Sequence, residues 1–182
     1  MSDYTVDELE KLRYPIGKFA PKKERTAEER RQDIAAITRF AVSLNETVLP
    51  LNPGQLSTPY RPGGWSVTQL VHHLADTGMY AYLRFKKGLT EDAPHIPSYR
   101  QDLWAEQSDY INEPVESSLR ILEGLHSRFA NLLNSLEIVD FAKIFVSAGL
   151  GTMDLDTALQ RYVWHNRHHM AQITELICRS GW

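Results

Sequence analysis

Residues 155–179 read LDTALQRYVWHNRHHMAQITELICR, and this stretch decides the fold. Its apolar side chains recur at steps of three and four residues, which is the period of an amphipathic α-helix. The predicted helix runs from about residue 154 to 179, and Gly181 follows as a typical helix-ending residue. The stripe consists of Leu155, Leu159, Tyr162, His165, Asn166, His169, Ile173 and Leu176. One long helix is therefore predicted here, with two histidines on its apolar side.

Three further stretches show the same period. Residues 26–47 open with Thr26 and Glu29, and residues 66–88 open with Ser66 and Gln69, so both have the pattern of a capping box. A third helix is predicted to begin near Pro114 and to carry leucines through residue 136. Four long helices, no convincing strand and no internal repeat predict an all-α fold, a four-helix bundle forming one domain over residues 1–182.

The segments outside the helices lack a clear period. The first 25 residues are predicted to be an extended strap on the surface, because aromatic residues alternate there with proline and glycine. Residues 89–112 form a long connection between the second and third helices, with at most a helical turn or two near residues 102–108. A connection this long in a domain of this size usually packs over something. Residues 137–152 read as irregular.

Composition narrows the classes of function. A content of 42% apolar and 24% charged residues is ordinary for a soluble globular protein, and a net charge of −3 gives no reason to expect nucleic acid. The single cysteine, Cys178, excludes an internal disulfide and fits a reducing compartment. No apolar run approaches the roughly 20 residues that cross a bilayer. The polar, acidic first 12 residues do not resemble a targeting peptide, so we expect a cytoplasmic protein.

The histidines carry the functional signal. His165 and His169 are four residues apart, so their Cβ atoms are predicted to lie about 5–6 Å apart and both imidazoles can reach one ion. Burying two imidazoles requires two partners, and a shared metal supplies both. His168 is a competing ligand, but it is rotated away from the apolar stripe, so His169 is preferred. A third imidazole would come from the second helix, where spacing alone hardly separates His72 from His73.

Three histidine ligands would leave one position open, which is typical of a working metal rather than a structural one. The H-E-x-x-H motif of zinc proteases is not met, because Asn166 stands where that motif has its glutamate. Phosphate-binding and dinucleotide-binding glycine motifs are absent from the sequence. His95 and His126 have no supporting pattern and are expected to have surface or packing roles.

Several segments together resemble one family. They are 13–17 (RYPIG), 58–67 (TPYRPGGWSV), 71–76 (VHHLAD), 84–86 (RFK), 125–126 (LH) and 162–165 (YVWH). This combination resembles the DinB/YfiT-like superfamily, and in particular its YfiT-type metal-dependent hydrolases. The resemblance implies a four-helix bundle that holds one divalent ion, zinc or nickel, with three histidines matching His73, His165 and His169. It also implies a homodimer. Where the family often has a His-Pro pair, residues 145–148 read FVSA.

The expected chemistry follows from three neutral ligands around a divalent ion. Such an ion lowers the pKa of a bound water to about 7, which predicts hydrolysis of a small-molecule substrate. It would also deprotonate a bound thiol, and the resemblance implies transfer of a low-molecular-weight thiol such as bacillithiol as an alternative. A third possibility is a non-catalytic metal-binding stress protein. Gln69 and Asp76, one turn on either side of His73, are candidates to orient its imidazole.

The two aperiodic segments are predicted to wall a cleft that leads to the metal. The strap contributes Tyr14 and Phe19, and the long connection contributes Tyr99 and Trp104. The alternative is that these residues only cover helix surface or form a dimer contact.

Overall fold

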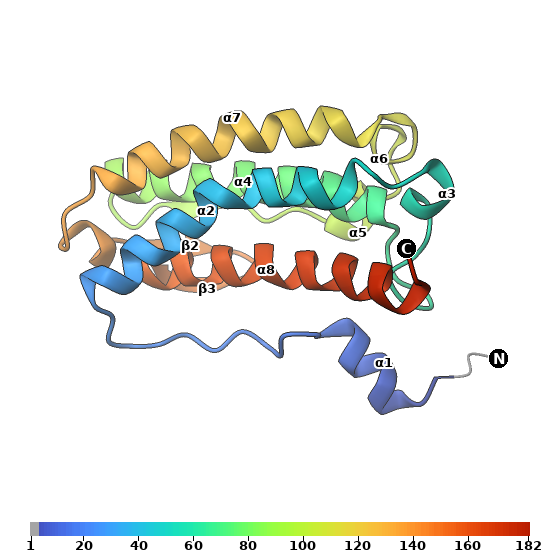
Figure 1. Ribbon diagram of the computed structural model, residues 1–182. Coiled ribbons are helices and arrows are strands. Elements are labelled where there is room, and N and C mark those ends of the chain that lie inside the picture. Colours follow the sequence, from blue (N-terminus) through green and yellow to red (C-terminus); the bar gives the residue numbers. More distant parts are fainter. Residues whose placement is uncertain (1–3) are drawn as a thin grey trace.

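Four long helices form an antiparallel bundle, as the sequence predicts. In the computed structural model, which describes residues 4–182, they are α2 (Ala27–Val48), α4 (Val67–Thr90), α7 (Val115–Asn134) and α8 (Leu155–Ser180) (Figure 1). The predicted ends agree closely with these bounds. The expected all-α four-helix bundle is therefore confirmed, with one small sheet added to it.

The helix ends follow the capping residues in the sequence. Thr26 and Ser66 each accept a hydrogen bond from the backbone three residues on, and the side chains of Glu29 and Gln69 return one to the cap. Such a cap contributes about 1 kcal/mol to helix stability. At the other end of α8, Gly181 adopts φ 69°, a left-handed conformation that glycine takes without a Cβ penalty.

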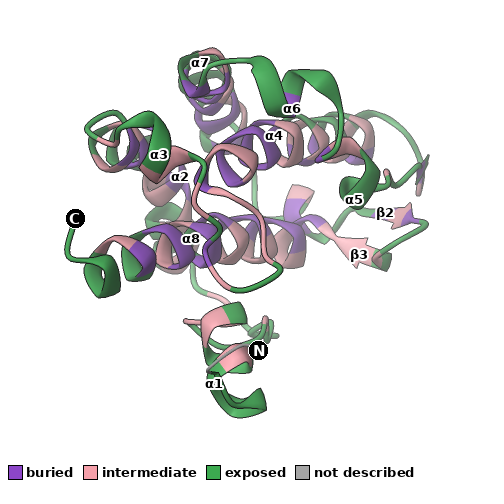
Figure 2. Ribbon diagram, turned by 90° about the vertical axis from the view of Figure 1, so that its right-hand side faces the viewer, coloured by how far each residue is buried: buried purple, intermediate pink, exposed green. Residues whose placement is uncertain are grey.

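The apolar core consists of two clusters separated by polar side chains. One cluster surrounds Phe85, Phe129 and Leu159, and the other surrounds Leu44, Leu70 and Leu122. Figure 2 shows the buried residues on the facing sides of the helices. Between the clusters, α7 and α8 bury His126, Asn166, His168, His169 and Gln172. A polar layer inside a bundle needs partners for its nitrogen and oxygen atoms, so it marks where a site is to be sought.

Three short strands correct the expectation that the chain has none. They are β1 (His95–Ile96), β2 (Ile144–Ser147) and β3 (Gly151–Asp154), in the order β1-β2-β3. β1 pairs with β2 in parallel, with His95 opposite Val146, and β2 pairs with β3 antiparallel. Strands of two to four residues are too short to show a period-two pattern, and β1 finds its partner only in the folded chain.

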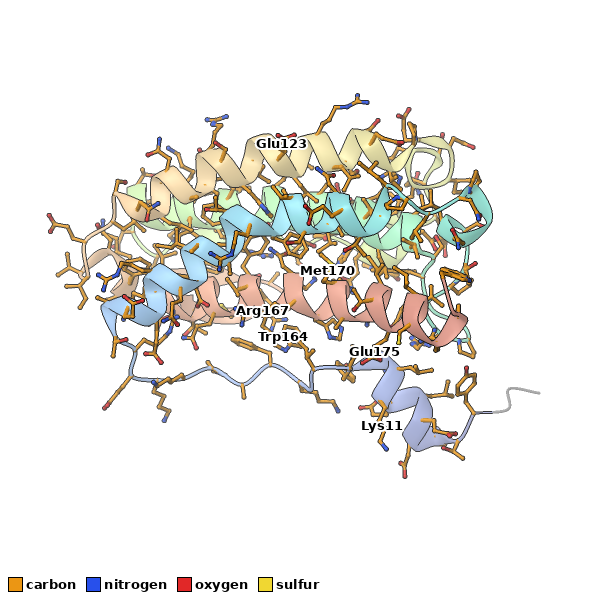
Figure 3. All side chains as sticks on the ribbon, in the orientation of Figure 1. Lys11, Glu123, Trp164, Arg167, Met170 and Glu175 are labelled. Carbon is orange, nitrogen blue, oxygen red and sulfur yellow. The ribbon has the colours of Figure 1, made fainter. Side chains whose placement is uncertain are left out.

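The N-terminal segment is partly helical, which corrects the prediction of an entirely extended strap. Helix α1 (Val6–Arg13) begins at Thr5, which forms a capping box with Glu8. None of its residues is buried, so no apolar stripe announces it in the sequence. Residues 14–25 then run extended beside α8 (Figures 1 and 3), where Phe19 packs on Trp164 with ring centroids 5.8 Å apart.

Short helices occupy the connections. They are α3 (Pro53–Leu56), α5 (Gln101–Trp104), α6 (Ser108–Asn112) and the 3-10 turn η1 (Asp140–Ala142). The side-chain amide of Gln69 on α4 donates to the Ala105 carbonyl at 2.9 Å, which holds the long connection against the bundle. Within residues 4–182, no helix combines the length and the apolar character that crossing a bilayer requires.

Candidate metal centre

Two facing helices bring three imidazoles to one point. His73 comes from α4, and His165 and His169 come from adjacent turns of α8. The Nε2 atom of His165 lies 3.2 Å from Nε2 of His73 and 3.2 Å from Nε2 of His169. A ligand nitrogen from each of the three residues lies within 4.8 Å of the others. The structure thus brings together the three histidines that the sequence comparison with the family indicated.

This spacing fits a shared cation better than hydrogen bonds among the rings. Nitrogen ligands at about 2.0–2.1 Å from one ion in tetrahedral arrangement are about 3.3 Å apart. A neutral imidazole carries only one N–H, so Nε2 of His165 cannot donate to both neighbours. Within the described chain, Nδ1 of His165 is buried without a hydrogen-bond partner. The donor set, three converging imidazole nitrogens, therefore suits a borderline divalent ion such as zinc or nickel.

Burial keeps the three imidazoles neutral. It lowers the pKa of His73 to about 4, and it holds the pKa values of His165 and His169 well below their usual range, with the neighbouring imidazoles adding to the effect. A neutral imidazole has a free lone pair, whereas a protonated one has none. All three side chains can therefore bind a cation at neutral pH without first losing a proton.

A hydrogen-bond chain sets the tautomer of His169. The Gln172 amide nitrogen donates to the Arg13 carbonyl at 2.9 Å and lies 3.0 Å from Nε2 of His168. The Gln172 amide oxygen is therefore the acceptor that faces Nδ1 of His169, at 2.8 Å. The proton of His169 then sits on Nδ1 and leaves Nε2 free for a cation, as is usual for histidine ligands oriented by a second residue.

The competing histidines have other partners. His72 points to α7, where Nδ1 lies 2.7 Å from the Ser118 hydroxyl and Nε2 lies 3.2 Å from the Glu113 carbonyl. His168 stacks on Trp164, with ring centroids 4.8 Å apart, and contacts Gln172. Neither belongs to the cluster.

The two remaining histidines also lie apart from the cluster. His126 is buried and pairs with the Tyr162 hydroxyl at 2.6 Å, while His95 is exposed in β1. These positions agree with the packing and surface roles expected for them.

Gln69 and Asp76 do not orient His73, which corrects that expectation. Gln69 caps α4 and bonds to Ala105, and Asp76 accepts a short hydrogen bond from the Tyr110 hydroxyl. Both lie one turn from His73 on its own helix, but their side chains turn toward the α4–α7 connection.

Trp65, Thr77 and Tyr99 surround His73 instead. The Tyr99 hydroxyl lies 3.5 Å from Nδ1, at the limit of a hydrogen bond, and 3.0 Å from the Thr77 hydroxyl. The Thr77 hydroxyl lies 3.4 Å from Nε2, and the Trp65 ring packs with its centroid 4.8 Å from that of the imidazole.

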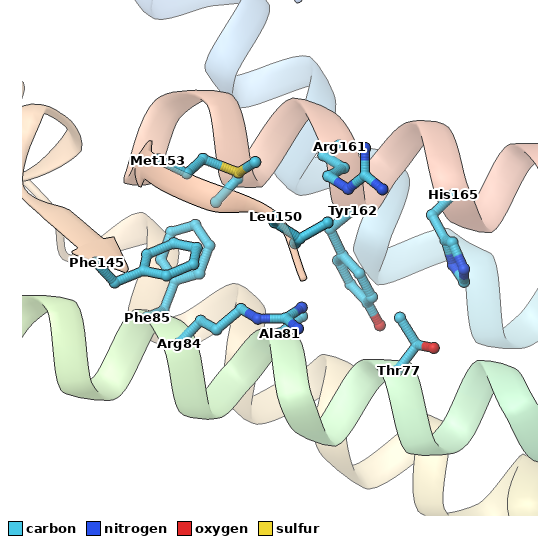
Figure 4. A pocket seen from close by; sticks show the side chains of 11 residues that line it. Thr77, Ala81, Arg84, Phe85, Phe145, Leu150, Met153, Arg161, Tyr162 and His165 are labelled. Carbon is cyan, nitrogen blue, oxygen red and sulfur yellow. The ribbon is translucent and has the colours of Figure 1, made fainter. Parts of the chain in front are cut away.

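Two cavities reach the cluster from opposite sides. One is lined by His165 and Thr77, together with residues from β2 and β3 (Figure 4). The other is more polar and is lined by His169, Gln172 and Tyr14.

The aromatic residues of the two aperiodic segments have different places. Tyr99 contacts the cluster directly, and Trp104 stacks behind it with ring centroids 4.5 Å apart. Tyr14 lines the polar cavity, whereas Phe19 lies outside both cavities against Trp164.

Sequence reasoning missed Gln172 and Tyr99. Gln172 follows His169 by three residues and His168 by four, which is a neighbouring position on a helix, so this spacing is a signal that could have found it. Tyr99 had no such signal, because it comes from a connection 26 residues away from His73.

We expect Gln172→Leu to weaken metal binding by about 10- to 100-fold, the usual effect of losing a residue that orients a histidine ligand. Gln160→Leu is a matched control. Gln160 is on the same helix and also holds the strap, through Lys22 at 2.8 and 3.1 Å, but it touches no imidazole. A metal titration by calorimetry measures both variants. Equal losses in the two would mean that the strap, rather than the tautomer of His169, controls affinity.

Known proteins resemble this chain in sequence and in structure. The sequence profile of the DinB superfamily matches residues 36–173. A relative from Geobacillus thermodenitrificans, named "Putative metal-dependent hydrolase", is 45% identical over 175 residues, which cover 96% of this chain and 98% of the relative. A relative of the same name from Bacillus anthracis is 45% identical over 171 residues, covering 94% of this chain and 98% of its own.

One solved structure has the same fold throughout. YfiT from Bacillus subtilis, described as a probable metal-dependent hydrolase with an unusual four-helix bundle topology, matches with a TM-score of 0.92 and 40% identity. The match covers 94% of this chain and 99% of YfiT.

Proposed function

This chain belongs to the DinB superfamily, and from that premise we propose that it is a metal-dependent hydrolase whose ion is held by His73, His165 and His169. The observation that carries the proposal is the convergence of three neutral imidazole nitrogens beside a cavity. Zinc and nickel both suit such a donor set. The small-molecule substrate and the homodimer expected from the sequence are part of the same proposal.

A divalent ion bound there would lower the pKa of a coordinated water to about 7 and so supply a nucleophile at neutral pH. The protein contributes the surroundings of that reaction. Thr77 and Tyr99 place two hydroxyl groups at the cluster, 3.0 Å from each other. Burial raises the pKa of Tyr99, so its hydroxyl stays protonated and can donate a hydrogen bond to a substrate oxygen. Tyr99 lies on the connection between α4 and α7, which therefore helps to position the substrate.

No carboxylate lines the cavity beside His165 within the described part of the chain. This differs from the H-E-x-x-H arrangement, in which a glutamate acts as general base. With a nucleophile of pKa near 7, no stronger base is required. We therefore propose a hydrolase in which the hydroxyls orient the substrate and no side-chain carboxylate moves the proton.

The test compares water and thiols as acceptors for one electrophile. Elemental analysis of the purified chain first measures the metal, and activated esters and amides are then offered with and without bacillithiol or cysteine. We expect about one ion per chain and hydrolysis that stops with a chelator and returns with Zn²⁺ or Ni²⁺. A product that carries the thiol whenever thiol is present would replace hydrolysis with thiol transfer. Metal binding without either product would indicate a non-catalytic binding protein.

A further inference from the structure

The cavity beside His165 combines an apolar wall with two arginines. Arg84 extends from α4 and Arg161 from α8, and both guanidinium groups point along the cavity in the direction of His165 (Figure 4). Arg161 precedes His165 by four residues, which is about 6 Å along a helix axis. The remaining lining is mostly apolar: Ala81, Phe85, Phe145, Leu150, Met153 and Ala158.

Neither arginine has a carboxylate partner within residues 4–182. The other partly buried arginines of the bundle do have one: Arg25 lies 2.6 Å from Asp33, and Arg30 lies 2.9 Å from Asp156. Nε of Arg84 is buried without a hydrogen-bond partner in the described chain. Buried polar groups normally have partners, so the contrast between the two pairs of arginines points to a ligand.

Aromatic rings support the two guanidinium groups and leave their N–H edges free. The guanidinium carbon of Arg84 lies 5.7 Å from the centroid of Tyr80, and that of Arg161 lies 5.5 Å from the centroid of Phe19. Burial lowers the pKa of both arginines, and Arg161 adds to the effect on Arg84, yet arginine stays protonated in proteins. Two positive charges without a counter-charge thus face one cavity. An anion would stabilise both.

We propose that this cavity binds an organic anion, with a carboxylate or similar oxyanion between Arg84 and Arg161 and an apolar group against Phe85, Phe145 and Met153. Arginine forms paired hydrogen bonds with planar oxyanions, which suits it to this role. This inference rests on the proposed function for its consequence: the substrate is an apolar ester or amide that carries a separate negative charge near the bond that water cleaves. Water gives its hydroxyl to the acyl carbon and its second proton to the leaving group.

Binding of two matched compounds tests the proposal without any turnover. Calorimetry compares 4-phenylbutanoate with 4-phenylbutanamide, which have the same shape but differ in charge. A hydrogen bond to a charged group changes an equilibrium constant by about 10- to 100-fold, so we expect the acid to bind at least tenfold more tightly. Arg84→Gln and Arg161→Gln should each lower the affinity for the acid by about tenfold and leave that for the amide unchanged.

Arg128→Gln is the matched control. Arg128 is exposed, and its guanidinium also lies over a tyrosine, 5.6 Å from the centroid of Tyr82, but it does not line the cavity. We expect this variant to bind both compounds as the wild type does. An equal effect of Arg128→Gln would overturn the proposal, as would equal affinity of the wild type for acid and amide, including no binding of either.

The carboxylate might instead be held by the metal, so the titration is repeated after chelation. Preference for the acid that survives chelation supports the arginines, and preference that disappears with the metal overturns their role. Because binding is measured directly, a protein that prefers the acid but hydrolyses nothing would contradict the proposed hydrolase function alone.

Discussion

Replacing His73, His165 or His169 with alanine is expected to abolish stoichiometric binding of a divalent metal. The three Nε2 atoms converge from two helices, with His165 3.2 Å from each of the others, so no remaining side chain can substitute for a lost one. Zinc sites with four protein ligands bind with about 10–16 kcal/mol, or about 3 kcal/mol per ligand, which corresponds to more than 100-fold in affinity. Elemental analysis after dialysis and a competitive zinc titration measure the effect.

His72→Ala and His168→Ala are the controls, because each lies next to a proposed ligand in the sequence but faces other partners. His72 bonds to Ser118 and the Glu113 carbonyl, so its loss should lower the stability of the α4–α7 contact and leave the metal in place. His168→Ala should retain stoichiometric metal. If either control variant loses the ion while its fold is intact by circular dichroism, the assignment of ligands is wrong.

Removing the metal is expected to lower the melting temperature by about 8–16 °C. A ligand that binds only the native state adds about 4 kcal/mol of stability when its concentration is 1,000 times its dissociation constant. For a chain of 150–250 residues, each kcal/mol shifts the melting temperature by about 2–4 °C. The three imidazoles link α4 to α8, so the ion should stabilise the contact between these helices. Differential scanning calorimetry with and without a chelator measures the shift.

The chelator itself must not cause the effect, and His165→Ala supplies that control. This variant should melt at the temperature of the metal-free wild type and should not respond to the chelator. A wild type that loses its ion, by elemental analysis, and melts unchanged would show that the site contributes little to folding.

The resemblance, rather than the spacing, selected His73 over its neighbour. Adjacent residues on a helix point about 100° apart, so one of His72 and His73 had to face away from α8, and the pattern of α4 alone did not say which. In the structure α4 packs against both α7 and α8. His72 meets Ser118 on one side, and His73 meets His165 on the other.

The sequence by itself determined the features that depend on neighbours along one helix. The period of three and four residues located all four long helices, Thr26 and Ser66 marked their starts, and the spacing of His165 and His169 placed two imidazoles side by side. These features are local, because a helix repeats every 3.6 residues whatever it packs against.

Only the tertiary structure decided which distant segments meet. The pairing of β1 with β2, the approach of Tyr99 to His73, and the two arginines that share one cavity all join residues far apart in the chain. The contact of Gln172 with the Arg13 carbonyl, 159 positions away, is of the same kind. Such contacts depend on how the helices pack and where the connections cross them, and no short-range pattern encodes that packing.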